Sequence, residues 1–408
     1  MSAKKVQQKS TATPTKEPTS KPSAKNKRTK RPPRTKKQKI ILGIIITILA
    51  LLVIALGVIA YFIFRDTEQA KTERVEFPDP IYSVLTGEEI SDAALNKNPT
   101  YCIQIPNGAD GARPQAGLNQ AGVIFEAIAE RGITRFAAIF QNPTVSAIGP
   151  IRSLRPYYLD WDTPFDCTVV HAGGSAEAIA AINAGGQRNL DESLEYMWRE
   201  QGGTRAWNNL FTSSTELAAF NKDNGYGTSD VRAFARLTPD ETDKIVRERQ
   251  TCPESEDGEE CIVEYISPSI SFGAMPSYNT VYTYNPETNT YARSYATGDP
   301  HLVYDCAPQS STPNTQSECG ELIQLTPSVV IAMIVSESQM SDGYHEDIKT
   351  TGSGNTMIFQ NGGVIEGTWH KNSQTSQIIF EDNEGNEIKL APGQTWIAAV
   401  PQYGNITY

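Results

Sequence analysis

The most apolar stretch of the chain lies near its start and predicts a membrane-spanning helix. Residues 40–64, IILGIIITILALLVIALGVIAYFIF, are 25 consecutive residues without a charged side chain. A helix needs about 20 such residues to cross the hydrocarbon core of a bilayer. The apolar part of a cleaved signal peptide is shorter, and no A-x-A cleavage site follows this stretch. We therefore expect an uncleaved signal-anchor.

After this stretch, shorter apolar runs alternate with polar turns and predict an α/β (α+β) domain over residues 85–245. Runs rich in β-branched and aromatic residues indicate strands, and the two runs on either side of residues 130–132 are typical of a hairpin. Pro156 suits the first turn of a helix, and Ser175 suits the N-cap of another. The predicted strands are residues 101–105, 123–129, 133–140 and 167–171. Two predicted helices begin near Pro156 and at Ala176, and a third covers residues 190–199.

From Cys261 onward the pattern changes to short strands broken by Asn, Gly, Pro and Asp. This spacing predicts a second, β-rich domain over residues 261–408 with few helices. The predicted strands are residues 281–284, 291–295, 328–336, 356–359, 377–380, 388–390 and 395–400.

Charge divides the chain at the predicted span. The 408 residues carry a net charge of −11, but residues 1–39 hold 14 Lys and Arg and one acid. Residues 65–408 hold 22 Lys and Arg against 46 Asp and Glu, a net charge of −24. The excess of Lys and Arg before the span predicts a cytoplasmic N-terminus and places residues 65–408 outside the cell. We expect residues 65–84 to form a stalk.

Residues 1–39 are rich in Lys, Thr, Pro and Ser and have no apolar period. This composition predicts a disordered tail. A tail of this charge suits nucleic acid or anionic lipid headgroups, and its position beside the span favours the lipid. We therefore expect no nucleic-acid partner.

Six cysteines in an exported chain predict disulfides. Two pairs each bracket a polar loop that has no core of its own, and each bond would stabilise the fold by about 3 kcal/mol on the chain-entropy model. Cys102 and Cys167 lie in predicted strands and either bridge neighbouring strands or remain buried thiols. The candidate pairs are Cys252 with Cys261 and Cys306 with Cys319.

Residues 147–176 contain the chemistry of an anion-binding site. Arg152 and Arg155 lie three residues apart before a predicted helix, and Arg135 lies in a predicted strand. Guanidinium groups offer forked donors to phosphate or carboxylate. A Gly-rich turn at the start of a helix offers backbone amides to the same groups. The candidate anion-binding residues are Arg135, Arg152, Ser153, Arg155, His171, Gly173, Gly174 and Ser175.

Other interpretations of these residues stay open. The arginines also fit structural ion pairs with Asp160, Asp162 or Glu126. Ser175 and His171 suggest a Ser/His hydrolase, although HAGGSA lacks the G-x-S-x-G elbow. We expect no metal, because neither the cysteines nor the four histidines have the spacing of metal ligands. No P-loop or dinucleotide fingerprint is present, so we expect no cofactor.

Eight short motifs are spread along both predicted outer domains. They are LTG at 85–87, ARPQAGLNQA at 112–121, GITRF at 132–136, GPIRS at 149–153, HAGGS at 171–175, GDPH at 298–301, EGTWHK at 366–371 and PGQTWI at 392–397. Together they resemble the YerB-like family of uncharacterised bacterial lipoproteins over nearly all of residues 83–408. The resemblance implies an extracytoplasmic bacterial protein with an N-terminal and a C-terminal family domain, and no established activity. The chain departs from the lipoprotein pattern because residues 40–101 contain no cysteine for a lipid anchor.

Two classes of function remain. The first is a binding or regulatory module of the cell envelope that recognises an anionic wall polymer, peptide or lipid headgroup. The second is a cell-envelope hydrolase acting on a wall polymer. We favour the first, because three arginines near a helix start, in an otherwise acidic domain, suit an anionic ligand. The expected partners are the bacterial cell membrane, through a single span, and an anionic wall polymer or envelope protein.

Overall fold

The computed structural model describes residues 35–70, 79–200, 207–251, 263–273, 275–306 and 319–408. Contacts divide the chain into two compact units, Met1–Pro78 and Asp79–Tyr408. The candidate pair Cys252 and Cys261 lies outside the described residues, as does most of the basic tail.

The first unit contains helix α1 (Lys36–Ala70). Within the described part of the chain, α1 is the one helix that is long and apolar enough to cross a membrane, over Lys39–Tyr61. The large apolar side chains described in this stretch are exposed. A helix that is apolar on all sides is stable only where lipid or protein surrounds it. Because α1 runs to Ala70, the first residues of the predicted stalk are helical.

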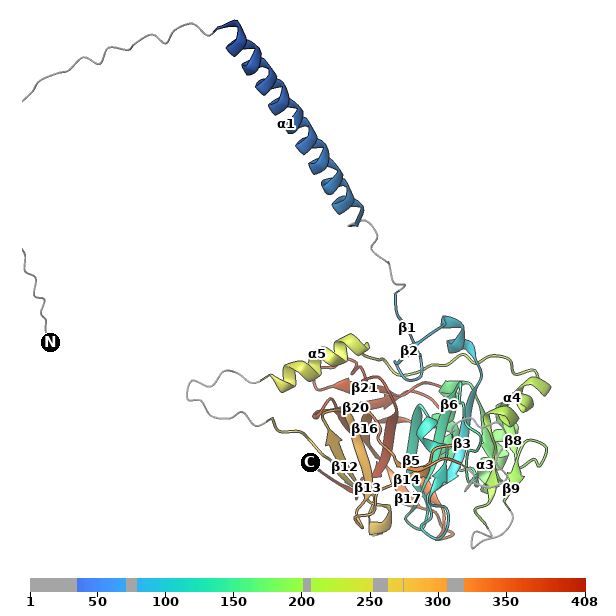
Figure 1. Ribbon diagram of the computed structural model, residues 1–408. Coiled ribbons are helices and arrows are strands. Elements are labelled where there is room, and N and C mark those ends of the chain that lie inside the picture. The colour runs from blue at the N-terminus through green and yellow to red at the C-terminus, as the bar shows by residue number, and fades with distance from the viewer. Residues whose placement is uncertain (1–34, 71–78, 201–206, 252–262, 274, 307–318) are drawn as a thin grey trace, which may run out of the picture. The chain divides into compact units, whose positions relative to one another are not determined.

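The second unit is organised around a ten-stranded sheet of mixed direction (Figure 1). The strand order is β21-β20-β19-β16-β22-β5-β6-β3-β7-β8. Four neighbouring pairs are parallel, namely β16–β22, β22–β5, β3–β7 and β7–β8. The strands are β3 (Thr100–Pro106), β5 (Val123–Glu130), β6 (Ile133–Gln141), β7 (Cys167–His171), β8 (Arg188–Asp191), β16 (Val329–Val335), β19 (Gly352–Gln360), β20 (Gly363–Lys371), β21 (Ile379–Asp382) and β22 (Thr395–Pro401).

Smaller sheets and helices surround the central sheet. A four-stranded sheet consists of β13 (Thr290–Tyr295), β12 (Thr280–Asn285), β11 (Ser269–Ser271) and β23 (Asn405–Thr407). A three-stranded sheet consists of β15 (Leu322–Gln324), β14 (Leu302–Tyr304) and β4 (Gln115–Ala116). Strand pairs are β1 (Ile81–Tyr82) with β2 (Glu89–Ile90), β9 (Trp198–Arg199) with β10 (Leu210–Phe211), and β17 (Glu337–Gln339) with β18 (Glu346–Ile348). The α-helices are α2 (Pro156–Asp162), α3 (Ala176–Gly185), α4 (Ser214–Asp223) and α5 (Pro239–Gln250), and the short 3-10 helices are η1 (Ala93–Lys97), η2 (Leu118–Gln120), η3 (Thr163–Phe165) and η4 (Pro276–Tyr278).

Both faces of the central sheet are buried. Along β5, Ile124 and Ile128 belong to one apolar cluster, whereas Phe125 belongs to another. Successive strand side chains point to opposite faces, so the two clusters lie on opposite sides of the sheet. The first cluster includes Tyr282 of the four-stranded sheet, and the second includes Trp161 of α2.

The structure confirms the predicted mixed α+β class, and strands hold more residues of the second unit than helices do. The hairpin β5–β6, the strand β7 and the helices that begin at Pro156 and Ala176 lie where they were predicted. The predicted helix over residues 190–199 is wrong, because β8, a turn and β9 occupy this region. Leu190 is buried opposite Val170 of β7, and this parallel pairing overrides the local helical pattern. Residues 388–390 form no regular strand, although Leu390 makes an isolated bridge to Arg236.

The two predicted outer domains, 85–245 and 261–408, contribute to the same sheet. β22 of the second range pairs with β5 of the first, and Trp396 lies opposite Ile124. The four-stranded sheet of the second range also packs on the cluster that contains strands of the first. The two ranges therefore share a sheet and an apolar core, although their patterns of apolar and polar residues differ.

Two disulfides join described cysteines. Cys306 pairs with Cys319, as predicted. Cys102 of β3 pairs with Cys167 of β7, which settles the alternative left open by the sequence in favour of a bridge between neighbouring strands.

Candidate functional site

A hollow of about 300 Å³ opens at one end of the central sheet. At this end β3 finishes at Pro106, β5 finishes at Glu130 and β6 begins at Ile133. The hairpin turn therefore brings Arg131 to the same place as the loop that follows β3. The polar and aromatic residues that line the hollow are Asn107, Asp110, Glu130, Arg131, Thr134, Arg135, Arg152, Trp207, Asn208 and Tyr344.

Glu130 lies between two guanidinium groups. Arg135 Nη2 donates to one carboxylate oxygen at 2.7 Å, and Arg155 Nη2 donates to the other at 2.7 Å. Arg135 also donates to the carbonyl oxygen of Ser153 at 2.6 Å. Burial lowers the pKa of Arg135; Glu130 opposes this shift and Arg155 adds to it. One carboxylate is thus shared by two buried cations.

Two further arginines line the hollow. Arg152 is half-buried and donates to the carbonyl oxygen of Trp207 at 3.0 Å. Arg131 is exposed, and its guanidinium carbon lies 5.2 Å from the centre of the Tyr344 ring. Neither a carbonyl group nor an aromatic ring carries a full negative charge, so these two contacts do not neutralise the guanidinium groups.

The hollow is electrostatically positive within an acidic unit. The described residues that line it include three arginines, Arg131, Arg135 and Arg152, and two carboxylates, Glu130 and Asp110, and Arg155 donates to Glu130. The larger hollow of about 640 Å³ beside α2 and α3 differs, because carboxylates line it and no Lys or Arg does. Of the two hollows, the smaller one is therefore the more favourable surroundings for a negatively charged group.

The predicted site residues divide into two groups. Arg135 and Arg152 line the hollow. The carbonyl oxygen of Ser153 accepts from Arg135, and Arg155 donates to Glu130. His171, Gly173, Gly174 and Ser175 do not line it.

The backbone of residues 152–154 runs beside that of residues 172–175. Leu154 donates to the carbonyl oxygen of Gly173 at 2.9 Å, and Ser175 donates to that of Leu154 at 3.3 Å. The two parts of the predicted stretch are thus neighbours, but their side chains serve different purposes.

His171 and Ser175 have structural contacts and do not pair with each other. The buried imidazole contacts the carbonyl oxygen of Gly173 and the side chain of Asn189, both at 2.8 Å. The Ser175 hydroxyl caps α3 by accepting from the Ala178 amide at 3.3 Å, as predicted. The amide of Gly173 donates to Asp191 at 2.7 Å. In this part of the described chain, no nucleophile is in contact with a base.

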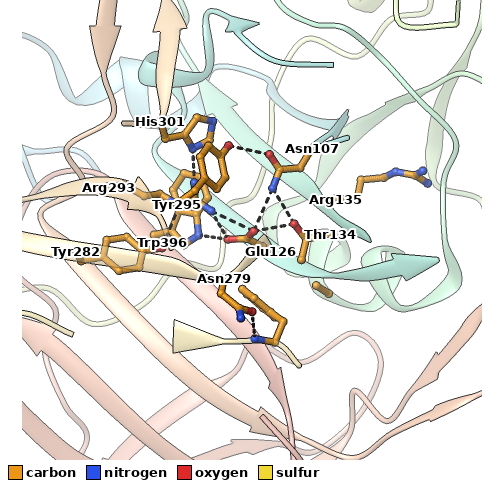
Figure 2. Close-up of polar contacts among 12 residues, drawn as sticks. Asn107, Glu126, Thr134, Arg135, Asn279, Tyr282, Arg293, Tyr295, His301 and Trp396 are labelled. Atoms are coloured by element: carbon orange, nitrogen blue, oxygen red, sulfur yellow. Dashed lines mark hydrogen bonds and ion pairs between the residues drawn. The ribbon is translucent and has the colours of Figure 1, made fainter. Parts of the chain in front are cut away.

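Beneath the hollow lies a buried polar network (Figure 2). Glu126 of β5 and Arg293 of β13 are fully buried and paired, at 2.9 Å between Nη2 and Oε2. Trp396 donates to the same oxygen at 2.9 Å, and Thr134 donates to the other at 2.8 Å. Asn107 donates to Thr134 at 2.8 Å, so the network reaches two residues of the hollow's lining. Figure 2 shows Arg135 apart from this network and directed away from Glu126.

His301 completes the network as a neutral imidazole. Burial and the nearby Arg293 and Arg113 hold its pKa well below the usual range. Arg293 contacts His301 Nδ1, and because a guanidinium only donates, Nδ1 accepts. Nε2 then carries the proton and donates to Gln115 at 3.0 Å.

Sequence reasoning missed most of this network. Glu126 was considered as a possible ion-pair partner of other arginines, and Arg293 was not considered. Trp396 and His301 lie in the motifs PGQTWI and GDPH, which were the available signal. No spacing rule connects Glu126 to Arg293, because they are 167 residues apart.

No cluster of three or more His, Cys, Asp or Glu side chains suited to a metal ion occurs among the residues that the structure describes. The arginine-rich lining is also unsuited to a cation. The chemistry that the hollow supports is recognition of an anion through charge-assisted hydrogen bonds.

The fold and the hollow together define an α+β protein in which two sequence halves share one sheet and one buried network. Two family descriptions match these halves. "Protein of unknown function (DUF3048) N-terminal domain" matches residues 85–227, and the corresponding C-terminal domain matches residues 270–397. The chain belongs to this YerB-like family.

A curated relative and a solved structure agree with this assignment. The "Putative lipoprotein YerB" of Bacillus subtilis (strain 168) is 26% identical over 321 residues, which cover 78% of this chain and 85% of that protein. The crystal structure of YerB protein from Bacillus subtilis superposes with a TM-score of 0.62 at 22% identity, over 80% of this chain and 100% of that chain. The fold is therefore shared with that structure.

Proposed function

We propose that the protein is anchored in the bacterial cell membrane by α1, with its N-terminus in the cytoplasm and residues 65–408 outside. The apolar stretch Lys39–Tyr61 supports the span. The 14 Lys and Arg of residues 1–39 support the orientation. The relative's name includes the word lipoprotein, which agrees with a place at the membrane surface.

We further propose that the outer unit is a binding or regulatory module that recognises an anionic ligand of the envelope in the arginine hollow. One observation carries the proposal: Glu130 is shared between Arg135 and Arg155, so one buried guanidinium charge is unbalanced beside Arg131 and Arg152. An anion entering the hollow would balance this charge in partly desolvated surroundings, where charge-assisted hydrogen bonds are strongest.

A hydrolase is less well supported. His171 uses both ring nitrogens on Gly173 and Asn189, and Ser175 caps a helix. Neither residue lines the hollow. A binding module explains the arginines without requiring a catalytic group.

The test uses the full-length protein in detergent micelles and isothermal titration calorimetry. The probes are a glycerol-phosphate oligomer, a glucuronate-containing oligosaccharide, an acidic muropeptide and glycerophosphoglycerol, the water-soluble headgroup of phosphatidylglycerol. The variant is Arg131→Gln/Arg152→Gln, because both side chains are accessible enough to be changed without emptying the core. Arg247→Gln on the exposed face of α5 is the matched control.

We expect at least one probe to bind, and the double variant to bind it at least tenfold more weakly, equivalent to about 1.4 kcal/mol. The control should bind as the parent does. Equal binding by the double variant and the parent, or no binding of any probe, would refute the anion site.

A further inference from the structure

We propose that the ligand of the arginine hollow is a carboxylate-bearing saccharide. This assignment rests on the proposed function, because it names the chemical class of the anion that the same site binds.

The first argument is the mixture of charges in the hollow. Arg131, Arg135 and Arg152 donate hydrogen bonds, whereas Asp110 and Glu130 only accept them when ionised. A phosphate polymer without hydroxyl donors gains from the arginines and is repelled by the carboxylates. An acidic saccharide has both kinds of group, since its carboxylate accepts from guanidinium groups and its hydroxyls donate to carboxylates.

The second argument is the pair of exposed aromatic rings. In the described part of residues 79–408, four aromatic side chains are more than a third exposed, and two of them line this hollow: Trp207 at 77% and Tyr344 at 39%. A large exposed ring is unfavourable in water unless another surface covers it. The C–H faces of sugar rings provide a flat apolar surface that packs against an aromatic ring.

The third argument is an unsatisfied donor in the wall of the hollow. Arg135 is only 4% exposed, and its Nε has no hydrogen-bond partner among the described residues. A buried donor without an acceptor is unfavourable. Because Arg135 is one of the residues that line the hollow, an anion bound there would lie near a guanidinium group whose donors are not all satisfied.

Size and polarity narrow the choice further. A cavity of 300 Å³ is at the lower limit of ligand pockets, which span roughly 300–1,000 Å³, so one or two sugar rings fill it. Apart from the two aromatic rings, Pro106 and Ile133 are the apolar side chains among its lining residues. Two aliphatic side chains and two rings in a lining that is otherwise polar leave little apolar surface for an acyl chain, which argues against a lipid.

The experiment titrates the full-length protein in detergent with four probes. They are a tetrasaccharide of alternating glucuronate and N-acetylglucosamine, the same tetrasaccharide with its carboxylates reduced to alcohols, a glycerol-phosphate tetramer and a tripeptide that contains alanine and glutamate. Trp207→Ala removes the more exposed ring. Tyr408→Ala removes an exposed ring that does not line the hollow and is the matched control.

We expect the acidic tetrasaccharide to bind, and carboxyl reduction and Trp207→Ala each to weaken binding at least tenfold. Tyr408→Ala should change binding less than twofold. Equal binding of the reduced tetrasaccharide, or no effect of Trp207→Ala, overturns the saccharide assignment.

The double variant Arg131→Gln/Arg152→Gln is titrated with the same probes. Tighter binding of the glycerol-phosphate tetramer or the tripeptide, weakened in this variant, overturns the saccharide while leaving the anion site intact. If no probe binds more weakly to this variant, the anion site itself is refuted, so the two failures are distinguishable.

Discussion

Replacing Glu126 by Gln should destabilise the protein by about 3–5 kcal/mol, the usual cost of removing one partner of a buried ion pair. Glu126 and Arg293 are both fully buried, so no water replaces the lost charge. Arg293 Nη2 contacts both oxygens of Glu126, at 3.1 and 2.9 Å. An amide at this position therefore presents its NH₂ group to a donor whichever way it is turned. The expected loss is a large fraction of the total stability of a typical domain, about 5–15 kcal/mol.

Urea unfolding of the full-length protein in detergent, followed by tryptophan fluorescence, measures this loss. Trp396 donates to Glu126 and so reports on the network itself. The double variant Glu126→Gln/Arg293→Met should be about 1–3 kcal/mol more stable than the sum of the single effects, because it leaves no unpaired buried charge. Glu366→Gln, which changes an exposed carboxylate, should stay within about 0.5 kcal/mol of the parent. A loss below about 1 kcal/mol for Glu126→Gln, or additive single effects, would refute the reasoning.

Three further predictions concern stability and topology. Burial raises the pKa of Glu337 to about 7, and because this lies above the unfolded value of 4.5, its contribution to stability is intact below pH 4.5 and is lost as the pH rises through about 7. The free energy of unfolding of Glu337→Gln, relative to that of the parent, should therefore rise by up to roughly 3 kcal/mol between pH 4.5 and pH 8. Urea unfolding measures this difference, and a difference that does not change with pH would contradict the prediction. Removing the bond between Cys306 and Cys319, which are 13 residues apart, by Ser substitution should cost about 3 kcal/mol in the same assay, and an unchanged unfolding midpoint would count against it. Protease added to intact cells should digest residues 79–408 and spare an epitope fused before residue 1, whereas loss of the epitope would reverse the proposed orientation.

Local pattern predicted those elements whose residues agree with their surroundings. The runs that became β5 and β6 are β-branched and aromatic, and they lie in a buried hairpin where such residues pack well. Ser175 was predicted as an N-cap because its hydroxyl satisfies a local amide, and it does so. The failure at residues 190–199 has the opposite cause: a distant strand, β7, determines the conformation of Leu190.

The candidate site was predicted only in part for the same reason. The arginines were visible because their charge is unusual in an acidic unit. Glu130 was placed in a turn, and the sequence did not identify it as the carboxylate that joins Arg135 to Arg155. Arg293 reaches Glu126 because the four-stranded sheet packs against the central sheet, and no local spacing encodes that contact.

The most direct test of the claim that the arginine hollow binds an acidic saccharide is a crystal structure of the protein grown with the glucuronate-containing tetrasaccharide. We predict that the saccharide lies in the hollow, with a carboxylate within hydrogen-bonding distance of Arg152 or Arg135 and a sugar ring against Trp207. An empty hollow with the saccharide bound elsewhere, for example at the start of α3 beside Ser175, would contradict the central claim.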